Sequence, residues 1–119
     1  MKYMLLIYDA PDTREIFSGP QHEQLMDRMN AIMDEIRASG EYVATQGLAD
    51  AATAKTVRLQ DGQPAITDGP FAEAKEQLGG YLVVDCEHER ALDIARRWPL
   101  VSSGGIEVRP VMFDGGAEM

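Results

Sequence analysis

Two short apolar runs place the tightest limit on the fold of this chain: YMLLIY at residues 3–8 and YLVV at residues 81–84. Each run carries apolar side chains at consecutive positions of a predicted strand, so both faces of each strand require burial. Only two segments, residues 21–39 and 87–98, have the 3-4 apolar spacing of an amphipathic helix. Two helices can cover one face of a sheet, so the other face needs a different cover.

Shorter patterns predict the remaining strands and complete the fold class. They lie at residues 42–48, 54–59, 64–67 and 106–113, with Asp61 and Gly62 as a hairpin turn. The resulting order β-α-β-β-α-β is the split βαβ, or ferredoxin-like, pattern of an α+β protein, here with an extra hairpin strand. We expect one domain, 1–119, and a homodimer that packs sheet against sheet as a dimeric α/β barrel.

Charge and composition exclude several classes of partner. The chain has 20 Asp and Glu against 11 Lys and Arg, and this net charge of -9 disfavours nucleic acid, whose phosphates are bound by clustered Lys and Arg. No apolar run approaches the about 20 residues of a membrane span, so we expect a cytoplasmic protein without a membrane partner. Cys86 is the one cysteine, and no Cys/His cluster has the spacing of a zinc site. We therefore expect neither a metal nor a cofactor.

One motif points to a family. Residues 67–81 read TDGPFAEAKEQLGGY, and this run resembles the signature of the YCII-related, or DGPF, domain family. The segments MKYMLLIY at 1–8, ATAKTVRL at 52–59 and IEVRPV at 106–111 also sit where that family carries them. Ala74 stands where the family more often has threonine, which argues against a hydroxyl-dependent role there. The resemblance covers nearly the whole chain.

The resemblance implies a ferredoxin-like protomer and a dimer, in agreement with the pattern of strands and helices. It does not imply one activity, because most members of the family have none assigned. The broader fold group includes enzymes that act on small ring compounds, such as muconolactone isomerases and a related dehalogenase.

The motif combines turn chemistry with charge. Asp68 precedes Gly69 and Pro70, so we expect its carboxylate to accept backbone N–H groups in an Asx-type turn, and Phe71 to anchor the loop in the core. The glycines at 79–80 permit close backbone packing. The candidate ligand-binding residues are Arg58, Phe71, Glu73, Lys75 and Glu76. The alternative is that Glu73, Lys75 and Glu76 are solvated and that Arg58 forms a cross-strand ion pair, and an exposed ion pair contributes only about 0–1 kcal/mol.

His22 is the candidate for acid/base chemistry. It shares a helix face with Leu25, Met26 and Met29, so we expect it to look into the cleft between helix and sheet. Histidine is the side chain whose unperturbed pKa lies closest to neutrality, and this suits proton transfer. The resemblance adds that shorter YciI-like members carry a histidine near the start of the first helix. The alternative is a polar residue at a half-buried edge.

Two hypotheses of different classes follow. The first is a cofactor-independent enzyme in which His22 moves a proton and Asp68 orients it, with a small organic acid or lactone as substrate by analogy with the fold group. The second is a non-catalytic dimeric module that binds a ligand or partner in a regulatory role. A single cavity lined by both His22 and Asp68 would favour the enzyme.

Overall fold

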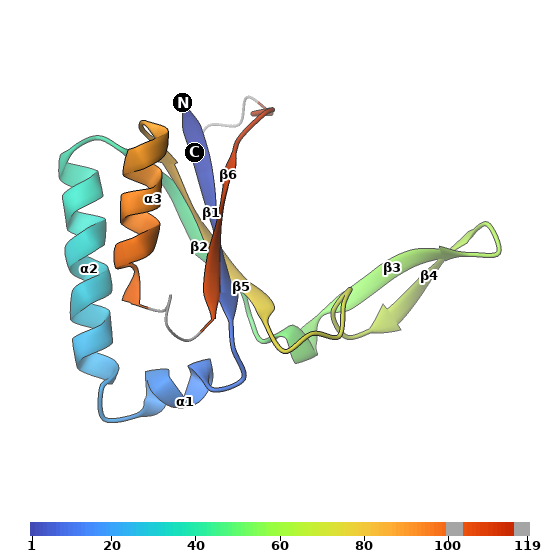
Figure 1. The fold of residues 1–119 in the computed structure, drawn as a ribbon. Coiled ribbons are helices and arrows are strands. Elements are labelled where there is room, and N and C mark those ends of the chain that lie inside the picture. Colours follow the sequence, from blue (N-terminus) through green and yellow to red (C-terminus); the bar gives the residue numbers. More distant parts are fainter. Residues whose placement is uncertain (100–103, 116–119) are drawn as a thin grey trace.

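The protein has a mixed α+β fold with antiparallel sheets and, among the described residues, three α-helices. The structure is a computed structural model that describes residues 1–99 and 104–115 (Figure 1). The strands are β1 (Lys2–Asp9), β2 (Tyr42–Gly47), β3 (Lys55–Gln60), β4 (Gln63–Asp68), β5 (Gln77–Asp85) and β6 (Gly105–Pro110). The helices are α1 (Thr13–Ser18), α2 (His22–Ala38) and α3 (His88–Arg97), and a short 3-10 helix, η1 (Ala51–Thr53), precedes β3.

Four strands form the main sheet in the order β2-β5-β1-β6, with every neighbouring pair antiparallel. Helices α2 and α3 pack on one face of this sheet (Figure 1). Because side chains alternate along a strand, every second residue of β1 points to these helices. The core on this face includes Tyr3, Leu5, Leu82, Ile36 and Ile94, all buried.

Helix α2 follows the predicted 3-4 spacing closely. Its buried residues are Leu25, Ile32, Met33 and Ile36. The helix ends at Ala38, and Gly40 terminates it as the sequence predicts, because this residue adopts a φ of 82° that suits glycine. The next amide, that of Glu41, donates to the carbonyl of Ile36 at 2.9 Å.

The opposite face of the main sheet carries the other half of the two apolar runs. Met4 and Leu6 of β1 and Tyr81 of β5 are half-buried there, and Leu78 is exposed. No helix of the described part of the chain covers this face (Figure 1). Two helices therefore cover one face, as predicted, and an apolar strip remains on the other.

Strands β3 and β4 form a separate hairpin that projects away from the main sheet (Figure 1). The predicted turn at Asp61 and Gly62 is confirmed, since both residues have positive φ, of 51° and 79°. This is the geometry of the two-residue turns that match the twist of a hairpin. The hairpin is thus an arm with its own two-stranded sheet.

Helix α1 is the element that no sequence pattern predicts. It has six residues, which is shorter than the window in which helical periodicity can be recognised. The helix lies across the end of the layer formed by α2 and the sheet (Figure 1). It therefore occupies the position where that layer would otherwise open.

Two arginines of α3 join the helices to each other and to the start of β2. Arg90 donates to Glu41 at 2.9 Å, to Glu35 at 2.7 Å and to Asp93 at 3.0 Å. Arg97 donates to Glu35 at 2.8 Å. Hydrogen bonds from Arg97 and Arg90 lower the pKa of Glu35 from 4.5 to about 2. Ionised Glu35 therefore stabilises the packing of α2 against α3.

We expect the Glu35→Gln variant to melt at a lower temperature than the wild type at neutral pH, and the difference to vanish in acid. The pKa of Glu35 is about 2 in the folded protein and 4.5 ordinarily, so the stabilisation is present above pH 4.5 and is lost as the pH falls toward 2. Calorimetric melting curves between these pH values measure it. The exposed neighbour Asp34→Asn is the control, and a difference that does not change with pH would contradict this role of Glu35.

Candidate functional site

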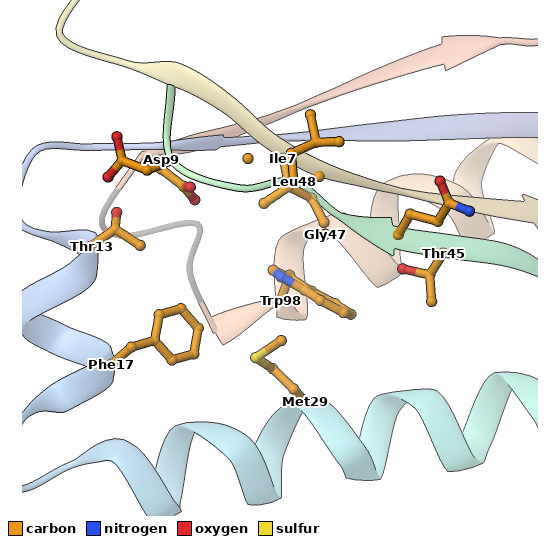
Figure 2. A pocket seen from close by; sticks show the side chains of 13 residues that line it. Ile7, Asp9, Thr13, Phe17, Met29, Thr45, Gly47, Leu48 and Trp98 are labelled. Atoms are coloured by element: carbon orange, nitrogen blue, oxygen red, sulfur yellow. The ribbon is translucent and has the colours of Figure 1, made fainter. Parts of the chain in front are cut away.

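A cavity of about 480 Å³ lies between one end of the main sheet and helices α1 and α2 (Figure 2). This volume falls within the range of about 300–1,000 Å³ that is typical of small-molecule sites. Its apolar lining comes from Ile7, Phe17, Met29, Leu48 and Trp98. Its polar side chains include Asp9, Thr13, Thr45 and Asp50. We call this cavity the Asp9 pocket.

Asp9 is the last residue of β1 and is half-buried in the wall of the pocket. Burial raises the pKa of its carboxyl above the ordinary value of 3.8. Among the described residues, none forms a hydrogen bond or ion pair with this carboxylate. Asp9 is therefore a carboxyl group that is partly removed from water and available to a ligand.

A β-bulge and a glycine make room for the Asp9 carboxylate. Ile7 pairs with Gly80 and Tyr8 pairs with Leu78, so Gly79 is the extra residue of β5. A Cβ atom at Gly79 would overlap the Asp9 carboxylate, and one at Gly80 would lie 2.7 Å from the carbonyl oxygen of Gln46. The close packing predicted for the two glycines is confirmed. The contact at Gly79 leaves space for the Asp9 carboxylate in the wall of the pocket.

Trp98 contributes an unsatisfied donor to the same pocket. Its side chain is 4% exposed, and its Nε1–H has no hydrogen-bond partner among the described residues. Figure 2 shows the indole between Met29 and the strands, with its nitrogen on the side nearer to the strands. A buried donor without a partner destabilises a protein by about 1–3 kcal/mol. The nitrogen atom itself is closed off from solvent, so a ligand that accepts this N–H has to displace its neighbours first.

The two groups together can bind and protonate or deprotonate a small molecule. A carboxyl with a raised pKa in a mostly apolar pocket is suited to general acid/base catalysis. A fixed N–H donor can hold an oxygen on which negative charge develops. The pocket therefore has the parts that proton transfer next to a carbonyl group requires.

Cys86 is not among the residues that line the Asp9 pocket. Cys86 packs against the core, and burial raises the pKa of its thiol, which lowers its reactivity at neutral pH. Within residues 1–99 and 104–115, no three His, Cys, Asp or Glu side chains are grouped so that they could hold a metal ion. Over the same residues, no helix is both long and apolar enough to cross a membrane.

The structure does not bring His22 and Asp68 together. His22 is the first residue of α2 and is exposed, so the expectation that it looks into the helix–sheet cleft is wrong. The reason is α1, because its Phe17 lines the Asp9 pocket whereas His22 does not, and the ring centres of His22 and Phe17 lie 6.3 Å apart in an edge-on contact. Asp68 ends β4 on the arm, where its carboxylate pairs with Lys55 in place of the expected Asx-type turn.

Phe71 does not anchor the motif loop in the core, because its side chain is 70% exposed. The arm forms a sheet of its own, so the hydrophobic core does not extend to this loop. Arg58 holds Phe71 instead: its guanidinium lies 4.1 Å from the centre of the ring and donates to the Phe71 carbonyl at 2.8 Å. These two candidate residues do lie together, as a surface contact.

The three charged candidates of the motif, Glu73, Lys75 and Glu76, are exposed. Glu76 and Phe71 line an open hollow of about 700 Å³ between the base of the arm and the end of the main sheet. We call it the arm hollow. It is separate from the Asp9 pocket, although Leu48 and Asp50 line both.

Comparison with known proteins agrees with the motif. Residues 1–113 match the model of the YCII-related domain. The chain belongs to the YCII-related domain family. A member from Rhizobium meliloti (strain 1021), called Uncharacterized protein R00369, is 33% identical over 114 residues, which cover 93% of this chain and 92% of that protein. The YCII-related resemblance carried by residues 67–81 is thus confirmed.

Sequence reasoning missed Asp9 and Trp98, the two groups to which we assign the chemistry of the pocket. Asp9 reads as a turn former after a strand, and Trp98 reads as one position of an apolar helix stripe. The available signal was the pair Gly79 and Gly80 in a strand of this YCII-related chain, because glycine inside a strand marks a bulge or the close approach of another group. That signal does not say which side chain approaches.

We expect Gly79→Ala to destabilise the protein by about 1–3 kcal/mol, since the added methyl group overlaps the Asp9 carboxylate. The loss should become smaller when Gly79→Ala is made in an Asp9→Ala background. Urea unfolding of the four proteins measures this coupling. Gly47→Ala is the control, because a Cβ there meets no atom within 4 Å. Equal losses in both backgrounds would show that Asp9 does not fill this space.

Proposed function

We propose that this YCII-related protein is a cofactor-independent enzyme that transfers a proton on a small molecule bound in the Asp9 pocket. The observation that carries the proposal is that one mainly apolar cavity is lined by a partly desolvated carboxyl, Asp9, and by an indole, Trp98, whose buried N–H has no partner among the described residues. A carboxylate takes a proton from the ligand, and the same carboxyl returns it to another position. Such an isomerisation is balanced without a cofactor.

The pocket favours a neutral carbonyl compound, such as a lactone, over the anion of an organic acid. A carbonyl oxygen accepts the Trp98 N–H, and the acidic C–H beside it faces a base. Asp9 and Asp50 both line the pocket, and two carboxylates repel an anion. Ile7, Phe17 and Met29 supply the apolar walls for the carbon skeleton.

We also propose a fold type, an oligomeric state and a cellular location for the protein. Read from β6, the main sheet has the order β6-β1-β5-β2, and this supports a ferredoxin-like protomer. The apolar strip of Met4, Leu6 and Tyr81 on the face without helices supports a homodimer of the dimeric α/β-barrel kind. We place the protein in the cytoplasm, without nucleic acid or membrane as partner.

We expect a lactone that raises the melting temperature of the wild type to bind about tenfold more weakly to Trp98→Phe, which replaces the indole by a smaller aromatic ring without an N–H donor. Asp9→Asn should still bind the lactone and should lose at least about 100-fold in turnover. Thermal shift and product analysis measure the two effects. Asp27→Asn, an exposed carboxylate of α2, is the control.

The pH profile gives a second test of Asp9. A general base acts when ionised, so turnover should fall as the pH drops through the folded-state pKa of Asp9, which lies above 3.8. Binding without turnover at any pH would favour the regulatory binding module. Loss of turnover in His22→Ala and Asp68→Asn, with Asp9→Asn active, would instead support the acid/base pair first expected from the sequence.

A further inference from the structure

The arm formed by β3 and β4 has one apolar face. Val57 lies opposite Ile66 and Leu59 lies opposite Pro64 in the hairpin register. Opposite residues of an antiparallel pair share a face, and so do residues two apart on one strand. These four side chains therefore form a single patch. Val57 is 61% exposed, and Leu59 and Ile66 are each 73% exposed.

The other face of the arm already has partners in its own chain. Arg58 holds Phe71 through the contacts described above, and the Thr56 hydroxyl donates to the Gly69 carbonyl at 2.8 Å. An isolated two-stranded hairpin is at best marginally stable in water and needs a packed face. The apolar patch is the face that lacks a cover within the described chain.

The arm and the uncovered face of the main sheet belong to one surface. The arm extends to the side of the sheet opposite α2 and α3 (Figure 1). The arm hollow joins them, because its lining includes Val57 from the arm and Tyr8 and Leu78 from the sheet. A body that packs on the sheet at this end also meets the arm.

The size of the exposed surface fits a second copy of the chain. The accessible surface is 8125 Å², whereas a compact monomer of 13.1 kDa exposes about 6,400 Å². The difference exceeds the about 800 Å² that each partner buries in a standard interface. The radius of gyration, 16.1 Å, likewise exceeds the about 13.5 Å of a compact domain of this length. The protomer has the extended shape of a subunit.

We propose that the arm is a dimerisation clasp, whose patch of Val57, Leu59, Pro64 and Ile66 packs on a second copy of this chain. In a two-fold pair each arm reaches around the other protomer, so the arm of one copy covers apolar surface of its partner and the reverse. This inference rests on the homodimer proposed above. It adds that the sheet faces alone do not hold the dimer and that the arm is required.

The test is sedimentation equilibrium of the wild type and of the double variant Leu59→Lys/Ile66→Lys. The wild type should be dimeric at 10 µM, and the variant should dissociate at least about 100-fold more readily, because two charges replace the centre of the patch. The matched control is Gln60→Lys/Gln63→Lys, which adds the same charge to the opposite face of the arm. The control should remain dimeric.

Hydrogen exchange of the wild type keeps the test independent of how the variants fold. The amides of β3 and β4 should exchange faster when dilution dissociates the dimer. Two results would contradict the clasp: a double variant that is as dimeric as the wild type, or arm amides whose exchange rate does not change when the dimer dissociates. Neither result would contradict the dimer or the function proposed for the Asp9 pocket. A wild type that is monomeric at 100 µM would overturn clasp and dimer together, while the lactone assay judges the pocket separately.

Discussion

The antiparallel pairing of β1 with β5, together with its bulge at Gly79, is the constraint on which the rest of the structure depends. The alternation along β1 sends Leu5 to the helices and Leu6 to the open face, so one pairing supplies the core and the apolar strip. The bulge then displaces the register by one residue just before the strand ends. As a result Asp9 lies over Gly79, inside a wall of the pocket.

The parts of the fold that the sequence predicts are those with strong local signals. The 3-4 spacing and Gly40 locate α2, and the Asp61-Gly62 pair locates the hairpin turn. Strand β5 begins at Gln77, four residues before the YLVV run that predicts it, because glycines conceal a strand that contains a bulge. The prediction that Phe71 packs in the core was wrong for a different reason. An aromatic residue after a turn favours the core, but only the tertiary structure shows that the arm stands apart from it.

The site was harder to predict because its parts lie far apart in the chain. Asp9, Gly79 and Trp98 come from three elements, and no local spacing links them. His22 was a natural candidate from its residue type and its helix face. The expectation failed because α1, a helix too short to be recognised in the sequence, places Phe17 in the pocket beside the start of α2. Because α1 was not predicted, the sequence analysis chose His22, which does not line the pocket.

The pocket and the arm are physically connected through the segment that leaves β2. Leu48 lines both the Asp9 pocket and the arm hollow, and its amide donates to the carbonyl of Gly79 at 2.8 Å, beside the bulge. At the base of the arm, the Gly69 amide donates to the Ala54 carbonyl at 2.8 Å. A partner that holds the arm therefore also restrains Leu48, one wall of the pocket. If the proposed dimer forms, the coupling is reciprocal, and a ligand that fixes Leu48 then favours the arm position that suits the dimer.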